Sequence, residues 1–271
     1  IISYRTAWLK AHFPGEFMAA LLSSEMGNTD KLPILIRETQ KMGIDVLPPN
    51  VNESYVRFRP TQNGILFGMA GVKNVGVGAV EAIVAERDKG GPFAGLIDFC
   101  MRLDARVVGR RVIESLVKCG AFDFTGMSRG RMFSGIDFAI NRSISAQRDK
   151  SAGQGSFFDL LAEEHEADTA DDLPEAEPWP THKMLLEEKE LLGFYISGHP
   201  LADYDWVMQN YSLATIGHLE DIPAGTTTRV GGMISNYEKK FTRKDQRPMA
   251  TFRLEGLEGD VDVIVFPDAF E

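Results

Sequence analysis

The stretch that decides the fold reads Gly71-Val72-Lys73-Asn74-Val75-Gly76-Val77-Gly78. Within it, Gly76-Val77-Gly78 lies between a short apolar segment, residues 69–75, and a predicted helix over residues 79–87. Gly76 and Gly78 allow the backbone to turn sharply and expose N–H groups at a helix start, an arrangement that binds phosphate oxygens without reading bases. A dinucleotide-binding loop is excluded, because the third glycine position of its motif holds Glu81. A helix C-cap with a plain loop between two core helices stays open, and spacing alone favours it.

A second segment with the same helix–turn–helix pattern follows. We expect a helix over residues 96–103, a turn over 104–109 and a partner helix over 110–119, ended by Gly120. Three basic residues lie at or next to that turn: Arg106, Arg110 and Arg111. Residues 102–150 carry ten bases against five acids. Paired hairpins with a basic flank suit contact with the backbone of duplex DNA, which is dominated by phosphate charge. The alternative is a basic face that only contacts solvent.

The overall charge would by itself argue against nucleic acid. The 271 residues contain 39 acids and 29 bases, a formal charge of −10. However, eight acids and no base lie within residues 163–177, in a stretch rich in Ala, Asp, Glu and Pro that is typical of a linker. Without those eight acids, 31 acids and 29 bases remain, so the rest of the chain carries only −2. The charge therefore does not exclude DNA.

Composition limits the class of protein further. The content of 44% hydrophobic and 25% charged residues is ordinary for globular domains, and the length suggests about two of them. No apolar run reaches the ~18 residues of a membrane span. Cys100 and Cys119 are too few for a disulfide framework or a thiolate zinc site, and we expect reduced thiols in a cytoplasmic protein.

Helices are predicted on both sides of the glycine-rich region. Residues 3–26 read as two helices, and Thr29 is a candidate cap for a third that extends to Met42. Residues 128–148 predict one helix, whose apolar side would hold Phe133, Ile136, Phe138, Ile140 and Ile144. A further helix is expected over 183–192, ended by Gly193.

The segments whose sequence predicts β-strands are shorter than the predicted helices. Residues 44–47 predict a short strand, and residues 55–59 and 65–67 predict a hairpin, whose loop we expect to be longer than two residues because it includes 60–62. Near the end of the chain, residues 228–237, 249–254 and 261–266 predict three strands.

Several motifs resemble the bacterial C-family replicative polymerases, the DNA polymerase III alpha subunits. Residues 4–14 (YRTAWLKAHFP) and 16–21 (EFMAAL) are similar to the end of the family's fingers domain. Residues 71–76 (GVKNVG) and 120–123 (GAFD) are similar to its tandem helix-hairpin-helix module, and residues 198–201 (GHPL) to the stretch before its OB domain. The resemblance covers essentially the whole chain. Since the chain starts without Met and stops within predicted strands, we expect an internal piece of a longer protein.

The resemblance implies a mainly α fold with a small β part. The expected domains are the C-terminal part of the fingers (1–50), a helix-hairpin-helix clamp-binding domain (51–162), an acidic linker (163–182), a helical connector (183–226) and the N-terminal part of an OB-fold β-barrel (227–271). A complete OB fold needs five strands, and only three are visible in the sequence.

A pair of adjacent aromatic residues precedes the acidic stretch, in Gln154-Gly155-Ser156-Phe157-Phe158-Asp159-Leu160. Exposed Phe pairs are normally avoided, and an anchor peptide would explain them. The pattern is similar to the family's sliding-clamp motif, Gln-x-x-(Leu or Met)-Phe, with Phe157 at the Leu/Met position. The resemblance implies clamp-binding residues at Gln154, Ser156, Phe157, Phe158 and Leu160. The alternative is a short amphipathic helix packed on the domain.

A basic segment separates the first two of the three C-terminal strands. Its candidate residues for single-stranded DNA are Lys239, Lys240, Phe241, Arg243, Lys244 and Arg247. Phe241 would stack on a base while the cations follow the phosphates, as in loops that join OB-fold strands. A lysine-rich tip that protects a sheet edge is the alternative.

No catalytic or metal-binding residue is predicted. Phosphoryl transfer by a polymerase needs carboxylates that converge on two metal ions, and the family's carboxylates lie in the palm, upstream of Ile1. We therefore expect an inactive fragment without cofactor, with Mg²⁺ confined to the parent's palm.

The expected partners are DNA, at Lys73, Gly76, Val77, Gly78, Arg106, Arg110 and Arg111, the sliding clamp (the beta subunit of the holoenzyme), and other replisome subunits through regions outside the chain. No membrane contact is expected. A stand-alone repair or recombination module with tandem hairpins, and a scaffold whose hairpins are only structural, remain open. Salt-dependent duplex binding separates the scaffold from the DNA binders, and clamp binding separates the polymerase from the repair module.

Overall fold

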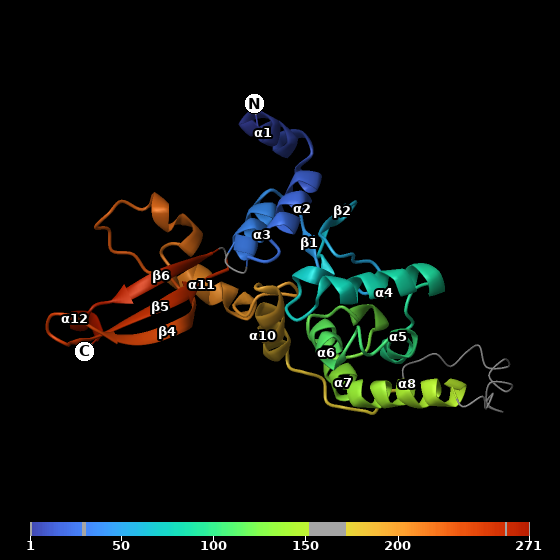
Figure 1. The fold of residues 1–271 in the computed structure, drawn as a ribbon. Coiled ribbons are helices and arrows are strands. Elements are labelled where there is room, and N and C mark those ends of the chain that lie inside the picture. The colour runs from blue at the N-terminus through green and yellow to red at the C-terminus, as the bar shows by residue number, and fades with distance from the viewer. Residues whose placement is uncertain (1, 29–30, 152–171, 258, 271) are drawn as a thin grey trace. The chain divides into compact units, whose positions relative to one another are not determined.

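The computed structural model describes residues 2–28, 31–151, 172–257 and 259–270 (Figure 1). The chain divides into two units, residues 1–197 and residues 198–271. The range 183–226, expected to be one helical connector, is thus divided between the two units. The prediction of a mainly α fold with a small β part is confirmed.

Three helices open the first unit: α1 (Ile2–His12), α2 (Pro14–Ser24) and α3 (Lys31–Lys41). Pro14 begins α2, a position where the missing N–H of proline costs no helical hydrogen bond. Thr29, the predicted cap of α3, lies outside the described residues. Met18 and Leu22 on α2 and Ile36 on α3 are buried, so α2 and α3 contribute to the core.

A small sheet follows, in the order β1 (Val46–Leu47), β3 (Gly64–Leu66), β2 (Arg59–Thr61). β1 is parallel and β2 antiparallel to β3. Thr61 pairs with Gly64, so two residues join β2 and β3, and the prediction of a longer loop was wrong. Pro60 and Thr61 belong to the strand, because an edge strand tolerates the missing N–H of proline.

Helices separated by turns form the rest of the unit. They are η1 (Met69–Gly71), α4 (Val77–Gly90), α5 (Leu96–Arg102), α6 (Arg110–Lys118), η2 (Asp123–Thr125), α7 (Arg129–Ser134), α8 (Ile136–Ser151) and α10 (Thr181–Leu192). Gly193 ends α10 with a φ of +88°, the left-handed conformation that glycine adopts without strain.

The single helix predicted over residues 128–148 is two helices, α7 and α8, separated at Gly135. A Cβ on this glycine would lie 2.9 Å from Leu173, whose buried side chain packs there from the segment before α10. The predicted apolar side is only partly correct. Ile136 is buried, whereas Phe138 is 41% exposed and Ile144 is also exposed.

One continuous hydrophobic core runs through the first unit, from Met18 to Leu192. The rings of Phe93, Phe99 and Phe122 are fully buried and meet edge to face. Helices α2 and α3 therefore share a core with the helices of the glycine-rich region, rather than enclosing one of their own. Leu173 belongs to the same core.

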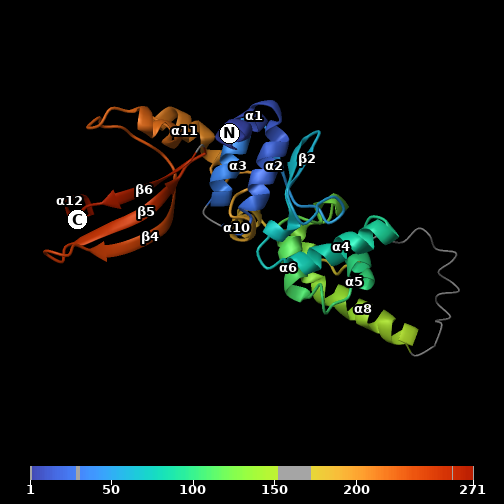
Figure 2. The same cartoon turned by 45° about the horizontal axis from the view of Figure 1, so that its top comes forward.

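The second unit contains η3 (Ala202–Tyr204), α11 (Asp205–Tyr211), η4 (Ile216–Asp221) and α12 (Pro267–Phe270) beside a three-stranded sheet. Its strands β4 (Met233–Phe241), β5 (Pro248–Glu255) and β6 (Asp260–Val265) are antiparallel and lie side by side in this order (Figure 2). The first strand begins at Met233, later than the predicted start at Thr228. The completion of this sheet into an OB barrel stays a prediction.

Candidate nucleic-acid interface

Two turns in the first unit repeat the same geometry 33 residues apart. Gly76 precedes α4 with φ −79° and ψ 156°, and Gly109 precedes α6 with φ −76° and ψ 169°. Equivalent apolar positions are buried in both copies: Val75 and Val108, Val80 and Ile113, Ile83 and Leu116. We call residues 71–76 the first hairpin and residues 103–109 the second. Their likeness supports the tandem arrangement predicted from the sequence.

The two hairpins differ in the element that leads into them. The second hairpin follows a helix, α5. The first follows strand β3 and the single 3-10 turn η1. Hence only the second copy has a regular α-helix on both sides of its turn.

Each hairpin leaves N–H groups unused at the start of the helix that follows. Ala79 and Val80 donate to the Gly76 carbonyl at 3.1 and 3.2 Å, which closes the first turn of α4. Within the part of the chain that the structure describes, the N–H groups of Val77 and Gly78 have no acceptor. Val77 is 50% exposed and Gly78 is exposed, so these donors are accessible. A helix start of this kind attracts anions, because N–H groups and the helix dipole act together.

The second hairpin offers the same donors next to positive charge. Val112 and Ile113 donate to the Gly109 carbonyl at 2.9 and 3.2 Å. Across the described ranges no acceptor is found for the N–H groups of Arg110 and Arg111.

Three of the four cations predicted to contact duplex DNA are paired with carboxylates. Arg106 lies 2.6 Å from Asp104, and Lys73 lies 3.7 Å from Glu190. Arg110 pairs with Glu114 at 2.7 Å and also with Asp137. Arg111 is exposed and has no carboxylate partner among the described residues.

The ion pair between Arg106 and Asp104 at the second hairpin changes the pKa of the carboxylate. Hydrogen bonds from the side chain and the backbone N–H of Arg106 lower the pKa of Asp104 to about 2. Asp104 is therefore ionised at any physiological pH. Phosphate groups that contact Arg106 must compete with this carboxylate.

Several bases of the cluster over residues 102–150 maintain the fold instead of forming a surface. Arg102 donates to the carbonyls of Glu86 and Gly91, both at 2.9 Å. Arg129 is buried against Glu188 and Asp123. Arg131 donates to the Leu173 carbonyl at 2.6 Å, and Lys118 pairs with Glu187 at 2.9 Å. The excess of bases in the sequence therefore overstates the charge that this region presents to a ligand.

Asn74 positions the first hairpin, a role that the sequence reading missed. Its φ is +71°, and its amide donates to the Ser115 hydroxyl on α6 at 3.2 Å. The neighbouring Lys73 N–H donates to the Leu191 carbonyl, at the end of α10, at 2.9 Å. Helices α6 and α10 thus both hold the first hairpin. The available signal was the residue type, since Asn adopts the left-handed conformation more readily than other side chains.

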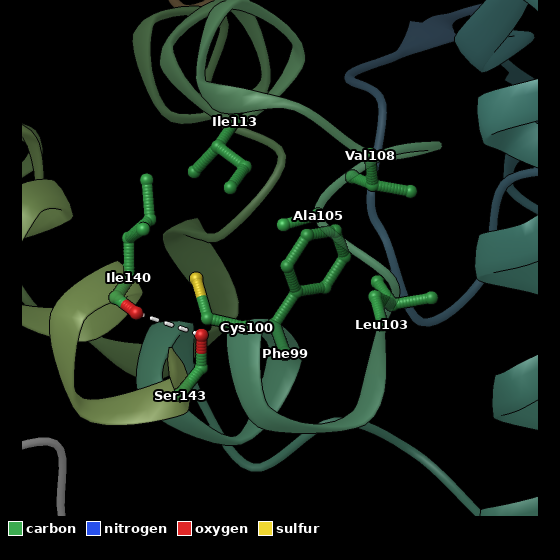
Figure 3. Close-up of a pocket in the computed structure, with 8 residues that line it drawn as sticks. All are labelled: Phe99, Cys100, Leu103, Ala105, Val108, Ile113, Ile140 and Ser143. Carbon is green, nitrogen blue, oxygen red and sulfur yellow. Dashed lines mark hydrogen bonds between the residues drawn. The ribbon is translucent and has the colours of Figure 1, made fainter. Parts of the chain in front are cut away.

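A small apolar pocket lies beneath the second hairpin (Figure 3). Its lining comes from α5, the hairpin, α6 and α8: Phe99, Cys100, Leu103, Ala105, Val108, Ile113, Ile140 and Ser143. The hydroxyl of Ser143 donates to the Ile140 carbonyl at 2.8 Å, so its proton is already used. The volume of about 10 Å³ admits at most one water molecule. This pocket is a packing gap that supports the hairpin and does not hold a ligand.

The residues predicted for single-stranded DNA are divided between a strand and a turn. Lys239, Lys240 and Phe241 lie on β4, not in a loop, so Lys239 and Phe241 share one face and Lys240 lies on the other. Phe241 is 57% exposed. Lys240 pairs with Glu238 at 2.7 Å, which occupies part of its charge.

The remaining three basic residues of this group lie in or next to the turn between β4 and β5. Arg243 and Lys244 lie in the β4–β5 connection, and Arg247 immediately precedes β5. Arg247 pairs with Asp268 on α12 at 2.8 Å. The structure thus brings the six residues to one end of the β4–β5 hairpin, although not to one face.

The predicted clamp peptide, Gln154, Ser156, Phe157, Phe158 and Leu160, lies outside the described residues. The chain leaves the described part after Ser151 at the end of α8 and returns at Asp172. The segment that begins at Asp172 packs on the first unit. Leu173 is buried there, and the centres of the Trp179 and Phe133 rings lie 5.2 Å apart.

Two properties of the described chain concern membranes and metals. No helix in the described ranges is long and apolar enough to cross a membrane. Among the same residues, no three His, Cys, Asp or Glu side chains come together where they could hold a metal ion.

Comparisons with known proteins agree with this geometry. The family profile described as a helix-hairpin-helix motif matches residues 43–132, which include both hairpins. DNA polymerase III subunit alpha of Borreliella burgdorferi is 34% identical over 100% of this chain and 24% of its own length. The alpha subunits of Haemophilus influenzae and Escherichia coli K12 are 35% and 33% identical, again over 100% of this chain and 23% of their own length. The chain spans about a quarter of the curated relatives that it matches.

Proposed function

Since this chain is related along its whole length to the DNA polymerase III alpha subunits, we propose that it is a DNA-binding and clamp-tethering segment of a replicative polymerase. The observation that carries the proposal is the pair of equivalent hairpins, each with unused N–H groups at the start of the following helix. Such donors contact the phosphate backbone and do not select a base sequence. This is the requirement for a polymerase that must hold any newly made duplex.

In this proposal the two hairpins act as adjacent phosphate clamps. Phosphate oxygens accept hydrogen bonds from the N–H groups of Val77 and Gly78 at the first hairpin, and of Arg110 and Arg111 at the second. Arg111 has no carboxylate partner among the described residues, so it can bind a phosphate without first breaking an ion pair. Lys73, Arg106 and Arg110 exchange their carboxylate partners for phosphate, and each freed carboxylate takes up a cation from solution. Binding is therefore weaker, and its salt slope smaller, than the number of basic residues suggests.

The substitution Val77→Pro tests the first hairpin directly. It removes one N–H at the first position of α4, where proline is tolerated. Gly76 already has the extended conformation that a following proline requires. We expect Val77→Pro to weaken duplex binding about tenfold or more, because a hydrogen bond to a charged group contributes about 1.5–3 kcal/mol.

Val77→Ala is the matched control, since it removes the same side chain and keeps the N–H. Binding is measured by fluorescence anisotropy of a labelled duplex over a series of salt concentrations. A wild-type chain without salt-dependent duplex binding would refute the DNA-binding function. Equal binding by the Pro and Ala variants would refute the role of the hairpin N–H groups.

The proposal also includes attachment to a sliding clamp through Gln154, Ser156, Phe157, Phe158 and Leu160. Its support is the likeness of residues 154–158 to the family's clamp motif, together with the homology of the whole chain. Tethering makes rebinding to DNA intramolecular and thereby makes a dissociating enzyme processive.

Titration with a bacterial sliding clamp tests this part. Changing Phe157 and Phe158 together to Ala should abolish binding, whereas Phe138→Ala, which removes an exposed ring from α8, should not change it. Clamp binding that survives the loss of both rings would contradict the assignment. Duplex binding without any clamp binding would favour the stand-alone repair or recombination module.

We place template-directed DNA synthesis, and the Mg²⁺ that supports it, in other parts of the longer polypeptide. The described residues do not fit a two-metal site, because no group of metal ligands converges among them. The role of this segment is to bind and position. Contacts with other replisome subunits lie in regions outside this chain, and the whole assembly acts on the chromosome in the cytoplasm. Incorporation of nucleotides by this chain alone in a primer-extension assay would contradict the proposal.

A further inference from the structure

A strip of exposed arginines lies outside both hairpins. Ser54 and Phe58 are buried, whereas Tyr55, Arg57 and Arg59 alternate with them and are exposed. We call Tyr55, Arg57 and Arg59 the arginine strip. The strip leads into strand β2, and its three side chains point away from the core at every second residue.

The aromatic ring of the strip is held between two guanidinium groups. The guanidinium of Arg59 lies 4.8 Å from the centre of the Tyr55 ring, and that of Arg87 lies 4.7 Å from it. Arg87 is buried and donates to the carbonyls of Val51 and Ser54 at 3.0 and 2.9 Å. These bonds fix Arg87, and through it the Tyr55 ring, so the strip has a rigid base.

The two exposed arginines of the strip have no carboxylate partner anywhere in the described chain. At the hairpins, by contrast, Lys73, Arg106 and Arg110 are all paired with acids. Arg57 and Arg59 therefore present charge that a phosphate can bind without displacing an acid.

The strip is attached to the first hairpin by the backbone. Met69 and Ala70 donate to the carbonyls of Tyr55 and Val56 at 2.8 and 3.3 Å. Gly68 lies directly against Arg57, since a Cβ there would be 2.6 Å from the Arg57 carbonyl carbon. Eight residues lead from Gly68 to Gly76, and a chain of that length spans at most about 29 Å. The strip and the first hairpin therefore lie within about one 34 Å turn of a DNA duplex.

We propose that the arginine strip is a further contact for the sugar–phosphate backbone of the same duplex that the hairpins bind. This inference rests on the proposed DNA-binding function and extends it to residues outside the helix-hairpin-helix turns. Guanidinium groups suit phosphate because their planar donors match two oxygens at once. A nucleic acid is favoured over an acidic protein because the strip is joined to a phosphate-binding turn on one rigid unit.

The experiment compares Arg57→Gln and Arg59→Gln, singly and together, with Arg5→Gln as control. Arg5 is an exposed arginine on α1, a helix that belongs to neither hairpin nor to the arginine strip. Binding to a labelled duplex of about 24 base pairs is measured from low to high salt. Each strip variant should reduce the slope of log affinity against log salt by about 1, and the double variant by about 2. Arg5→Gln should leave the slope unchanged.

The double change Arg57→Lys with Arg59→Lys keeps the charge and should restore most of the slope, which separates phosphate contact from a fold defect. Wild-type slopes in the strip variants, together with weakened binding by Val77→Pro, would overturn the arginine strip alone. Absence of duplex binding by the wild-type chain would overturn the strip and the proposed function together. Polyglutamate that competes with DNA at equal charge concentration, and loses this ability in the strip variants, would assign the strip to an acidic protein instead.

Discussion

The guanidinium of Arg129 is buried where α7 meets α10 and the segment after it. It donates to Glu188 at 2.7 Å, to Asp123 at 2.6 Å and to the Ser197 hydroxyl at 3.1 Å. Glu188 in turn accepts hydrogen bonds from the backbone N–H groups of Ile196 and Ser197, each at 3.0 Å. Burial opposes the charged form, yet hydrogen bonds and attraction from the two carboxylates raise the pKa of Arg129 above its ordinary value.

Removing one carboxylate of this cluster should be costly. Glu188 is 0% exposed, so Glu188→Ala leaves a buried guanidinium with half of its charge compensation. We expect a loss of about 3–5 kcal/mol in the free energy of unfolding, measured by urea denaturation. Glu190→Ala on the same helix is the control. Glu190 is 65% exposed, and its pair with Lys73 should contribute less than about 1 kcal/mol. Equal losses in the two variants would show that burial of the pair does not matter.

The same residue shows how far sequence reasoning reaches at this scale. The sequence assigns Arg129 to a basic DNA-binding flank, because its residue type and its neighbours are those of a basic surface. Its partner Glu188 is 59 residues away in the chain. No local pattern indicates such a pair. The predicted phosphate donors at Gly76–Gly78, in contrast, follow from the local conformation that two glycines allow, and the structure places them at an exposed helix start.

At the scale of elements, the first hairpin depends on helices that are distant in sequence. Asn74 lies at its tip in the left-handed conformation and reaches Ser115 on α6, while α10 accepts the Lys73 N–H. The two hairpins are thereby linked by a side chain as well as by the shared core. A fixed spacing between them is what two adjacent phosphate contacts require.

Substitutions of Asn74 separate its two roles. Asn74→Gly loses the hydrogen bond, for which we expect about 0.5–1.5 kcal/mol, and also removes the Cβ that strains the left-handed conformation. Asn74→Ala loses the same bond but keeps a Cβ there without the polar side chain by which Asn tolerates this conformation, so we expect it to be about 1–2 kcal/mol less stable than the Gly variant. Denaturation of both variants, with Ser115→Ala to remove the other end of the bond, measures these terms. An Ala variant as stable as the Gly variant would contradict the conformational role.

Element boundaries were predicted well where glycine or proline sets them. Gly120 and Gly193 end helices as expected, and Pro14 begins α2, because these residues act through their own backbone. The break between α7 and α8 was missed. Gly135 accommodates Leu173, which lies 38 residues further along the chain, and the sequence does not indicate that contact.

At the scale of the whole molecule, the two units differ in how much apolar surface they bury. The first contains the continuous core from Met18 to Leu192. In the described part of the second, Ile216 and Ala250 are the hydrophobic residues other than proline that are buried. The exposed apolar side chains of β4 and β6 include Ile234 and Ile264. A sheet with so little burial has little to oppose local opening.

Amide hydrogen exchange should reflect this difference. We expect the central amides of β4, β5 and β6 to exchange faster than those of α4 and α6, when each is compared with the rate of an unfolded peptide of the same sequence. Mass spectrometry of peptic peptides resolves the two regions. Equal protection in both units would contradict the conclusion that the second unit is held together weakly.

The sequence by itself determined the parts of this protein that depend on local backbone chemistry: the glycine turns before α4 and α6, the ends of most helices, and the acidic stretch that accounts for most of the net charge. Only the tertiary structure decided which arginines are available to a ligand. It buries Arg129, pairs Arg110 with Asp137, and leaves Arg57, Arg59 and Arg111 without carboxylate partners in the described chain. The physical reason is that conformational preference acts between neighbours along the chain. Charge compensation acts through space, so it depends on side chains that only folding brings together.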